Sequence, residues 1–194
     1  MGGEKAARTL SIVLSPQALA ILAFAGVSAA SCPEAVSWAV PLTVSVYAGL
    51  PAVLVAAEER RSGSKDHEFS LDQRASVMAR CVPAYALGSL LMLALGLPTP
   101  MWGLGLMYAA NTTLNLAVNR FWRMSVHAFS AAGALSLLTL FYWPEPALAG
   151  AAILPAVFWA RLRLRAHTPG QLLGGAILGA LISWMEMRVI LSLP

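Results

Sequence analysis

Long runs of apolar residues, separated by short polar segments, dominate the chain. Runs of about 20 residues are typical of helices that cross a membrane, because that length of helix spans the hydrocarbon core. The pattern predicts seven such helices. Their expected ranges are Thr9–Ser31, Ala35–Ala57, Cys81–Leu97, Met101–Asn119, Ser125–Trp143, Ala147–Ala160 and Pro169–Leu191. We therefore predict an all-α fold, a polytopic membrane helical bundle with about six or seven transmembrane helices.

One long polar stretch, residues 58–80, interrupts this pattern between the second and third predicted helices. It opens with two Glu and two Arg residues and continues with Ser-Gly-Ser-Lys at positions 62–65. Small and polar residues of this kind favour a flexible loop. Two Pro-x-Pro segments, at 98–100 and 144–146, predict tight turns elsewhere. The sequence thus places an exposed loop over 58–80 and short turns at the opposite end.

The composition agrees with a membrane protein. Hydrophobic residues make up 58% of the 194 residues and charged residues only 11%, whereas soluble domains carry about 25% charge. This excludes a water-soluble globule and a disordered chain. The length suits one domain, residues 1–194. Cys32 and Cys81 fall at opposite ends of different predicted helices, so neither a disulfide nor a thiolate zinc site is expected.

The basic residues are distributed unevenly over the connections. With seven helices crossing alternately, one side holds the N-terminal segment and the connections 58–80, 120–125 and 161–168. Those segments contain 12 of the 13 Lys and Arg residues, and only Arg188 lies elsewhere. The positive-inside rule puts this side in the cytoplasm of a multi-pass cell-membrane protein. Because these residues flank apolar stretches and form no patch with interleaved aromatics, a nucleic-acid partner is not expected.

The three histidines fall on the same predicted side. His67, His127 and His167 each lie near basic residues, one in or directly after each of the three connections. Histidine and arginine side chains gathered from separate connections can bind an anion and also transfer protons. The natural anion for such a site is a phosphate.

Two short segments around these histidines carry a resemblance to a known family. Ser125-Val126-His127 resembles the Ser-x-His motif of the type-2 phosphatidic acid phosphatase superfamily, the membrane lipid-phosphate phosphatases. Arg161, followed after five residues by His167, resembles that family's Arg-x5-His motif. The order of the two motifs, both on the predicted cytoplasmic side, supports the resemblance.

The remaining family motif is degenerate in this chain. It normally consists of a Lys, six residues and then Arg-Pro, and no Arg-Pro occurs here. Lys65, Arg74 and Arg80 are the candidates for its basic residues. The resemblance therefore covers about Lys65 to Gly179 in order and topology.

The resemblance implies roles for individual residues. His167 would attack the phosphorus atom and form a phosphohistidine, and His127 would protonate the leaving oxygen. The residues expected to bind the phosphate are Arg161, Ser125, Arg74, Arg80 and Arg123. No metal or other cofactor is implied, because the arginines supply the positive charge.

Position 171 departs from the family pattern. The family usually has Asp there, whereas this chain has Gln171, which would orient His167 through a hydrogen bond without adding charge. Thr168, Pro169 and Gln171 also form a good helix start with a capping box. That interpretation explains Gln171 but not His167. Ser125 could likewise serve as a helix N-cap, as a phosphate ligand, or as both.

Two further patterns concern packing between helices. Asn111, Asn115 and Asn119 recur on one helix face, which predicts hydrogen bonds between helices, and Gly174, Gly175 and Gly179 predict a close contact.

The favoured interpretation is a lipid-phosphate phosphatase whose site faces the cytoplasm. The expected substrates are phosphatidate-like or polyprenyl phosphates and diphosphates, and the other expected partners are membrane lipids. Two alternatives stay open. The first is a phosphotransferase that uses the same His167 intermediate with an alcohol acceptor. The second is a non-catalytic membrane protein that binds lipid phosphates; a small transporter is disfavoured because no internal repeat supports it.

Overall fold

The computed structural model describes residues 2–63 and 69–193, and within these ranges the chain is helical and contains no strand. The elements, in chain order, are α1 (Gly2–Val13), α2 (Pro16–Ser31), the 3-10 turn η1 (Pro33–Ala35), α3 (Val36–Val44), the π-helical segment η2 (Ser45–Gly49), α4 (Leu50–Ser62), α5 (Leu71–Ala94), α6 (Thr99–Asn119), α7 (Val126–Leu138), α8 (Glu145–Arg163) and α9 (Pro169–Ile190). The predicted all-α fold is confirmed.

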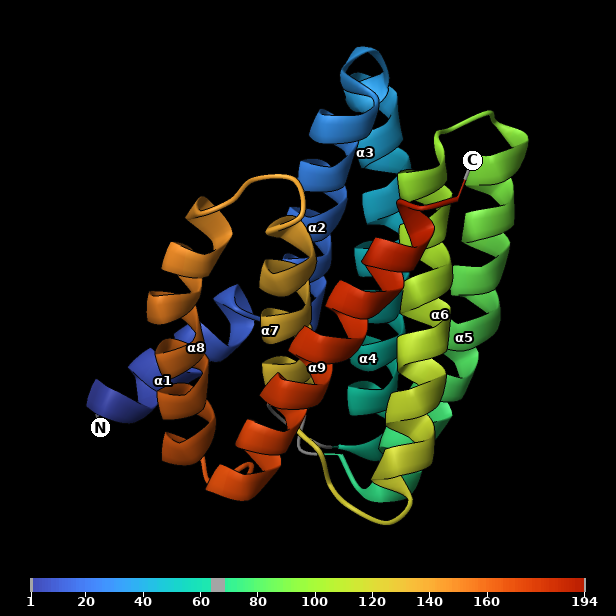
Figure 1. Cartoon of the computed structure of the whole chain (residues 1–194). Helices are drawn as coiled ribbons and strands as arrows, with labels where there is room; N and C mark the ends of the chain where they lie inside the picture. Colours follow the sequence, from blue (N-terminus) through green and yellow to red (C-terminus); the bar gives the residue numbers. More distant parts are fainter. Residues whose placement is uncertain (1, 64–68, 194) are drawn as a thin grey trace.

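The long helices lie side by side in a bundle, with α9 crossing it obliquely (Figure 1). The C-terminal end of α4, the N-terminal end of α5 and the connections α6–α7 and α8–α9 lie at one end, at the bottom of Figure 1. We call this end, which carries residues 120–125 and 164–168, the basic end. The short helix α1 packs against α8.

Four helical segments of the described chain are long and apolar enough to cross a membrane. They are Gly2–Ser31, Pro33–Ser62, Leu71–Ala94 and Pro169–Ile190. Large apolar side chains also point outward, as on α5, where Leu87 is 66% exposed. A soluble monomer rarely exposes apolar patches of this extent. These features are compatible with a membrane protein, and the predicted count of six or seven crossings stays a prediction.

The predicted loop over 58–80 is wrong for most of its length. Helix α4 continues to Ser62, and α5 begins at Leu71, ten residues before the predicted start at Cys81. A capping box starts α5 early: Ser70 Oγ accepts from the N–H of Gln73 at 3.3 Å, and Gln73 Oε1 accepts from the N–H of Ser70 at 2.8 Å. Lys65 and His67 lie outside the described residues.

Buried Glu58 explains how charged residues fit between α4 and α5. Its carboxylate is 1% exposed and accepts from Arg61 at 2.7 Å and from Arg80 at 3.1 Å. A buried carboxylate is tolerated only when its charge is paired in this way. Residues 58–62 and 71–80 of the polar stretch therefore belong to two helices.

The first predicted helix is interrupted. Ser15 caps the start of α2 by accepting from the N–H of Ala18 at 3.3 Å, and Pro16 follows it, so α1 ends before α2 begins. On α1, the small residues Ala7 and Ser11 form the buried face, and Gly3 lies against Arg163 at the end of α8. The N-terminal segment is therefore a separate short helix that covers part of the basic end.

Helices α7 and α9 touch through glycines. A Cβ atom added at Gly179 would overlap the carbonyl group of Phe129, and one added at Gly175 would lie 2.7 Å from the carbonyl oxygen of Ser125. Gly133, on α7, is similarly tight against Ser183. The predicted close contact at Gly175 and Gly179 is confirmed, whereas Gly174 faces the Trp122 ring.

The predicted asparagine row bonds mostly within its own helix. Asn111 Nδ2 donates to Glu186 Oε2 of α9 at 2.8 Å. Asn115 and Asn119 instead donate to backbone carbonyls one turn earlier on α6. One of the three side chains therefore joins two helices in the way the sequence predicted.

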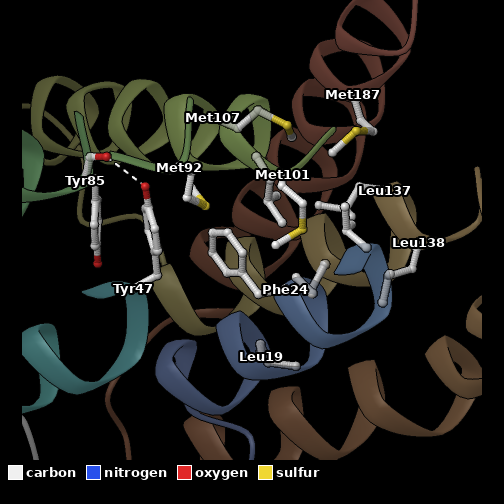
Figure 2. Close-up of a cluster of buried hydrophobic side chains, with 14 of the residues drawn as sticks. Leu19, Phe24, Tyr47, Tyr85, Met92, Met101, Met107, Leu137, Leu138 and Met187 are labelled. Atoms are coloured by element: carbon white, nitrogen blue, oxygen red, sulfur yellow. Dashed lines mark hydrogen bonds between the residues drawn. The ribbon is translucent and has the colours of Figure 1, made fainter. Parts of the chain in front are cut away.

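An aromatic cluster fills the centre of the bundle (Figure 2). The rings of Phe24 and Tyr47 stack at 4.4 Å, and those of Tyr47 and Tyr85 stack at 5.2 Å. The hydroxyl of Tyr47 donates to the carbonyl oxygen of Tyr85 at 2.8 Å. Tyr47 belongs to η2. Pro51, in the first turn of α4, has no N–H and so cannot donate to the carbonyl of Tyr47 four residues earlier. The helix widens there into a π turn, which helps to place the Tyr47 ring.

The glycine contact predicts the effect of one added methyl group. Gly179→Ala should destabilise the protein by about 2 kcal/mol, because overpacking against a backbone carbonyl cannot be relieved by rotating a side chain. Thermal unfolding of the detergent-solubilised protein measures this change. Gly170→Ala, in the first turn of the same helix, is the control, since an added Cβ there meets nothing within 4 Å. Equal unfolding temperatures for the two variants would contradict the proposed contact.

Candidate functional site

The turn after α8 explains why His167 follows Arg161 by six positions. Helix α8 ends in a Schellman motif: the N–H of Ala166 donates to the carbonyl of Arg161 at 3.0 Å, and the N–H of Arg165 donates to that of Leu162 at 3.0 Å. Arg165 adopts the left-handed conformation that this motif requires, with φ of 53°. The chain therefore folds back onto the last turn of α8. The turn runs from Arg161 to Ala166, and His167 is the next residue, so it follows Arg161 by six positions.

The start of α9 fixes the hydrogen position on His167. Gln171 Oε1 accepts from the N–H of Thr168 at 3.1 Å and lies 3.3 Å from Nδ1 of His167. A backbone N–H can only donate, so the Gln171 atom that meets it is the oxygen, and His167 Nδ1 must carry the hydrogen that points to it. Nε2 of His167 then keeps its lone pair. It is buried and has no hydrogen-bond partner among the described residues.

His127 has the opposite arrangement at its Nε2. It lies in the first turn of α7, where Nε2 is 3.2 Å from the carbonyl oxygen of Ser11 and 3.4 Å from its hydroxyl. A carbonyl oxygen accepts only, so Nε2 of His127 carries a hydrogen. One histidine of the pair thus offers a donor and the other a lone pair.

Arg161 is buried beside His127 and also contacts Ser11. It is 4% exposed, and its Nη1 donates to Ser11 Oγ at 2.7 Å. A guanidinium in such a place is costly to desolvate, which favours a role in binding an anion over a role as a topology signal alone. Ser11 of α1 therefore occupies the space between Arg161 and His127.

A backbone hydrogen bond holds the starts of α7 and α9 together. The N–H of Ser125 donates to the carbonyl of Gln171 at 3.2 Å. The hydroxyl of Ser125 accepts from the N–H of Ala128 at 3.4 Å, so Ser125 is the N-cap of α7, as one of the two interpretations expected. Its hydroxyl is fully buried and helps to fix His127 two residues later.

Arg74 joins this group from α5. It lies in the first turn of that helix, and its Nη1 is buried without a hydrogen-bond partner among the described residues. Arg123 is exposed in the connection before α7. Arg80, which was also predicted to bind phosphate, instead donates to Glu58 and does not line the site. The described structure thus gathers Arg74, Arg161, His127 and His167 and leaves Arg80 out.

A cavity of about 190 Å³ opens beside these side chains. Arg74, His127 and Arg161 line one part of it. The rest of its lining is mainly apolar, from Val77, Tyr85, Leu104, Met107 and Leu137 among others. One continuous space therefore joins cationic groups to an apolar interior.

The electrostatics of the site favour a neutral His167. Burial, together with the positive charges of Arg74 and Arg161, lowers the pKa of His167 from 6.5 to about 4. The hydrogen bond to Gln171 acts in the opposite direction and raises this pKa. At neutral pH the imidazole is therefore uncharged, and its Nε2 lone pair is available.

The arrangement can bind an anion and act on it with two histidines of complementary protonation. In the part of the chain that the structure describes, no group of three or more His, Cys, Asp and Glu side chains is placed to hold a metal ion.

Comparisons of the chain with protein-family models, with curated proteins and with solved structures found no match.

Two residues at the site were not predicted from the sequence. Ser11 lay inside a predicted transmembrane helix, and the signal for its real position was the Ser15-Pro16 helix start that follows it. Arg165 is one of the 12 basic residues that were used for the positive-inside rule, yet it takes the position in the turn where glycine is usual.

The charges around His167 lead to a prediction about its titration. Arg74→Gln should raise the pKa of His167 from about 4 toward its ordinary 6.5, because it removes a neighbouring positive charge that opposes protonation. Histidine side-chain NMR of the solubilised protein over a pH range measures this value.

Arg120→Gln is the matched control, because Arg120 lies at the same end of the bundle but is not among the charges that act on His167. A pKa of His167 that is the same in Arg74→Gln as in the unaltered protein would show that Arg74 is not its neighbour.

Proposed function

We propose that the protein is a membrane lipid-phosphate phosphatase that forms a phosphohistidine on His167. One observation carries the proposal: Arg74, His127 and Arg161 line one part of a cavity whose remaining lining is mainly apolar. His167 is not in this lining, but the charges of Arg74 and Arg161 act on it, and its buried Nε2 has no partner among the described residues. A lipid phosphate has the same two-part chemistry, an anion on a hydrocarbon chain. The likeness of the Ser125–His127 and Arg161–His167 spacings to the type-2 phosphatidic acid phosphatase motifs adds support.

In the first proposed step, Nε2 of His167 attacks the phosphorus atom. The bond from phosphorus to the oxygen of the lipid alcohol breaks, and His127, which enters this step as the imidazolium with hydrogens on both ring nitrogens, gives its Nε2 hydrogen to that oxygen and becomes neutral. Arg74 and Arg161 bind the other phosphate oxygens, where negative charge must be held as the transfer proceeds. Gln171 keeps the His167 hydrogen on Nδ1, so that Nε2 stays free to attack.

In the second step, water replaces the histidine. His127, now without its hydrogen, takes a proton from a water molecule that attacks the phosphorus atom, and the bond to Nε2 of His167 breaks. Inorganic phosphate leaves and both histidines return to their starting states. A lipid alcohol in place of water would make the protein a phosphotransferase, which is the runner-up function.

Ser11 takes the place that a phosphate oxygen needs in this scheme. Its hydroxyl accepts from Arg161 at 2.7 Å and lies 3.4 Å from Nε2 of His127, and both of these groups would bind the phosphate. Substrate binding therefore requires α1 to move away from the site. In the described arrangement, Ser11 of α1 therefore closes the proposed phosphate site.

The proposed chemistry makes different demands on the two histidines. His167→Ala should abolish both phosphate release and any acid-labile phosphoenzyme, because no other group supplies the attacking lone pair. His127→Ala should lower kcat by about 100-fold or more, as expected for loss of a general acid. With substrates that have good leaving groups, it should still accumulate phosphoenzyme. Phosphate release from a panel of phosphatidate and polyprenyl phosphates, with trapping of the phosphoenzyme, measures both effects.

Arg120→Ala is the control for general effects of substitution at this end of the bundle, and it should leave turnover unchanged. Turnover that survives His167→Ala would remove the nucleophile assignment. A folded protein that binds a lipid phosphate but releases phosphate from none of the panel would favour the non-catalytic alternative.

We also propose that the basic end faces the cytoplasm, as the positive-inside rule indicates. In a protein whose buried Cys32 and Cys81 are replaced by Ala, Phe121→Cys should resist an impermeant maleimide in intact cells and react after permeabilisation. Glu145→Cys, exposed at the opposite end, should react in intact cells. Labelling of Phe121→Cys in intact cells would reverse this orientation.

A further inference from the structure

We infer that a second cavity, between α1 and the end of α8, binds a phosphate group, and that an anion bound there holds α1 closed over the candidate site. The inference goes beyond the proposed function, because this anion regulates access and does not react, so its binding needs no turnover. The ligand is a small oxyanion, either inorganic phosphate or the phosphate of a lipid headgroup.

The second cavity is strongly cationic. Its volume is about 320 Å³, at the lower end of the range for small-molecule sites, about 300–1,000 Å³. Among the described residues, its lining has one carboxylate, that of Glu4, and four guanidinium groups, those of Arg8, Arg161, Arg163 and Arg165. A surplus of three positive charges around one cavity is repulsive, and a bound anion relieves that repulsion.

The cations come from two elements that face each other only while α1 is closed. Arg8 belongs to α1, where its Nη2 donates to Glu4 Oε1 at 3.0 Å. The other three belong to the end of α8 and the turn after it. Gly3 of α1 lies against the guanidinium of Arg163, since a Cβ atom added at Gly3 would be 3.5 Å from its Nε. An anion bound to Arg8 and to Arg163 or Arg165 therefore joins α1 to α8 (Figure 1).

Arg165 adds to the site at a position where the backbone favours glycine. Its φ of 53° lies in the left-handed region, which is unfavourable for a residue with a Cβ atom. Glycine would meet the conformational demand of this turn better. What arginine adds there is a guanidinium group in the wall of the cavity.

Few other contacts hold α1 in place. The buried residues of α1 are Ala7 and Ser11, and Ser15 caps the start of α2 with its own hydroxyl, so α2 keeps its cap when α1 leaves. A ligand that binds one of two forms better shifts the equilibrium toward that form. An anion between α1 and α8 therefore favours the form in which Ser11 contacts Arg161 and His127.

Thiol labelling at a buried position of α1 measures how often α1 opens. In a protein whose Cys32 and Cys81 are replaced by Ala, Ala7→Cys should react with a maleimide only when α1 leaves α8, because Ala7 is 0% exposed. At constant ionic strength, inorganic phosphate at about ten times its Kd should slow this labelling about tenfold, because a ligand of the closed form lowers the open population by the factor 1 + [L]/Kd. Ala6→Cys, at the exposed neighbouring position, is the matched control and should label equally fast with and without phosphate.

Arg165→Gly separates anion binding from folding. It removes one guanidinium but gives the turn its preferred residue, so the unfolding temperature should not fall, while phosphate should lose most of its effect on labelling. Arg163→Gln should also lose the effect, whereas Arg120→Gln, a charge loss at the same end but outside the cavity, should keep it. Slowing that survives both Arg165→Gly and Arg163→Gln would overturn the inference. If Ala7→Cys does not fold, Ser11→Cys, which is nearly isosteric, reports the same opening.

Two lipids in the detergent micelles distinguish the sources of the anion. Slowing by phosphatidylglycerol without added phosphate, and not by the zwitterionic phosphatidylcholine, would support the site with a lipid headgroup as its ligand. Slowing by inorganic phosphate alone would support the site with the free ion as its ligand.

The direction of the change separates this inference from the proposed function. Phosphate at the proposed reacting site would displace Ser11 and speed the labelling of Ala7→Cys. Labelling that is faster or unchanged with both inorganic phosphate and phosphatidylglycerol would therefore overturn the inference, and phosphate release from lipid phosphates by the same protein would leave the phosphatase standing. Slower labelling in a protein that releases no phosphate from any lipid phosphate would support the anion site and refute the phosphatase.

Discussion

The close approach of α7 to α9 positions most of the candidate site. Gly175 and Gly179 bring the two helix backbones together, and at the basic end the N–H of Ser125 reaches the carbonyl of Gln171. His127 follows Ser125 by two residues and His167 precedes Gln171 by four, so one backbone contact brings both histidines to the same end. Any side chain at the glycines would separate the helices and, with them, the two histidines.

The buried charged side chains of the described structure are tolerated because each either has a polar partner or lines the cavity. Glu58 is paired with Arg61 and Arg80, which neutralises a carboxylate between α4 and α5. Arg161 donates to Ser11. Arg74, whose buried Nη1 has no hydrogen-bond partner among the described residues, lines the cavity. Uncompensated positive charge in an apolar interior is costly, and an anionic ligand relieves that cost. Burial and the same charges lower the pKa of His167 and keep it neutral, so in the proposed enzyme anion binding and the reactivity of His167 share one electrostatic origin.

Local sequence signals predicted those parts of the site that depend on local structure. The helix start at Thr168–Gln171 and the spacing from Arg161 to His167 are set by caps and turns within a few residues, and both were readable. The glycine contact followed from small residues one turn apart. Arg74 and Arg80 could not be separated, because the early start of α5 and the burial of Glu58 decide which of the two reaches the cavity. Ser11 was missed because a run of apolar residues hides a break between two helices. The cavity depends on side chains from several helices, which no single segment encodes.

Gln171 makes the tautomer of His167 depend on whether the first turn of α9 is formed. The same oxygen closes the capping box of α9 and accepts the Nδ1 hydrogen of His167. Helix ends fray at free energies well below that of global unfolding. Each time the first turn of α9 frays, His167 loses the partner that fixes its tautomer, although the bundle remains folded. In the proposed mechanism, the tautomer that leaves Nε2 free to attack is favoured most while this turn is intact, so its share falls on warming at temperatures where the helices have not begun to separate.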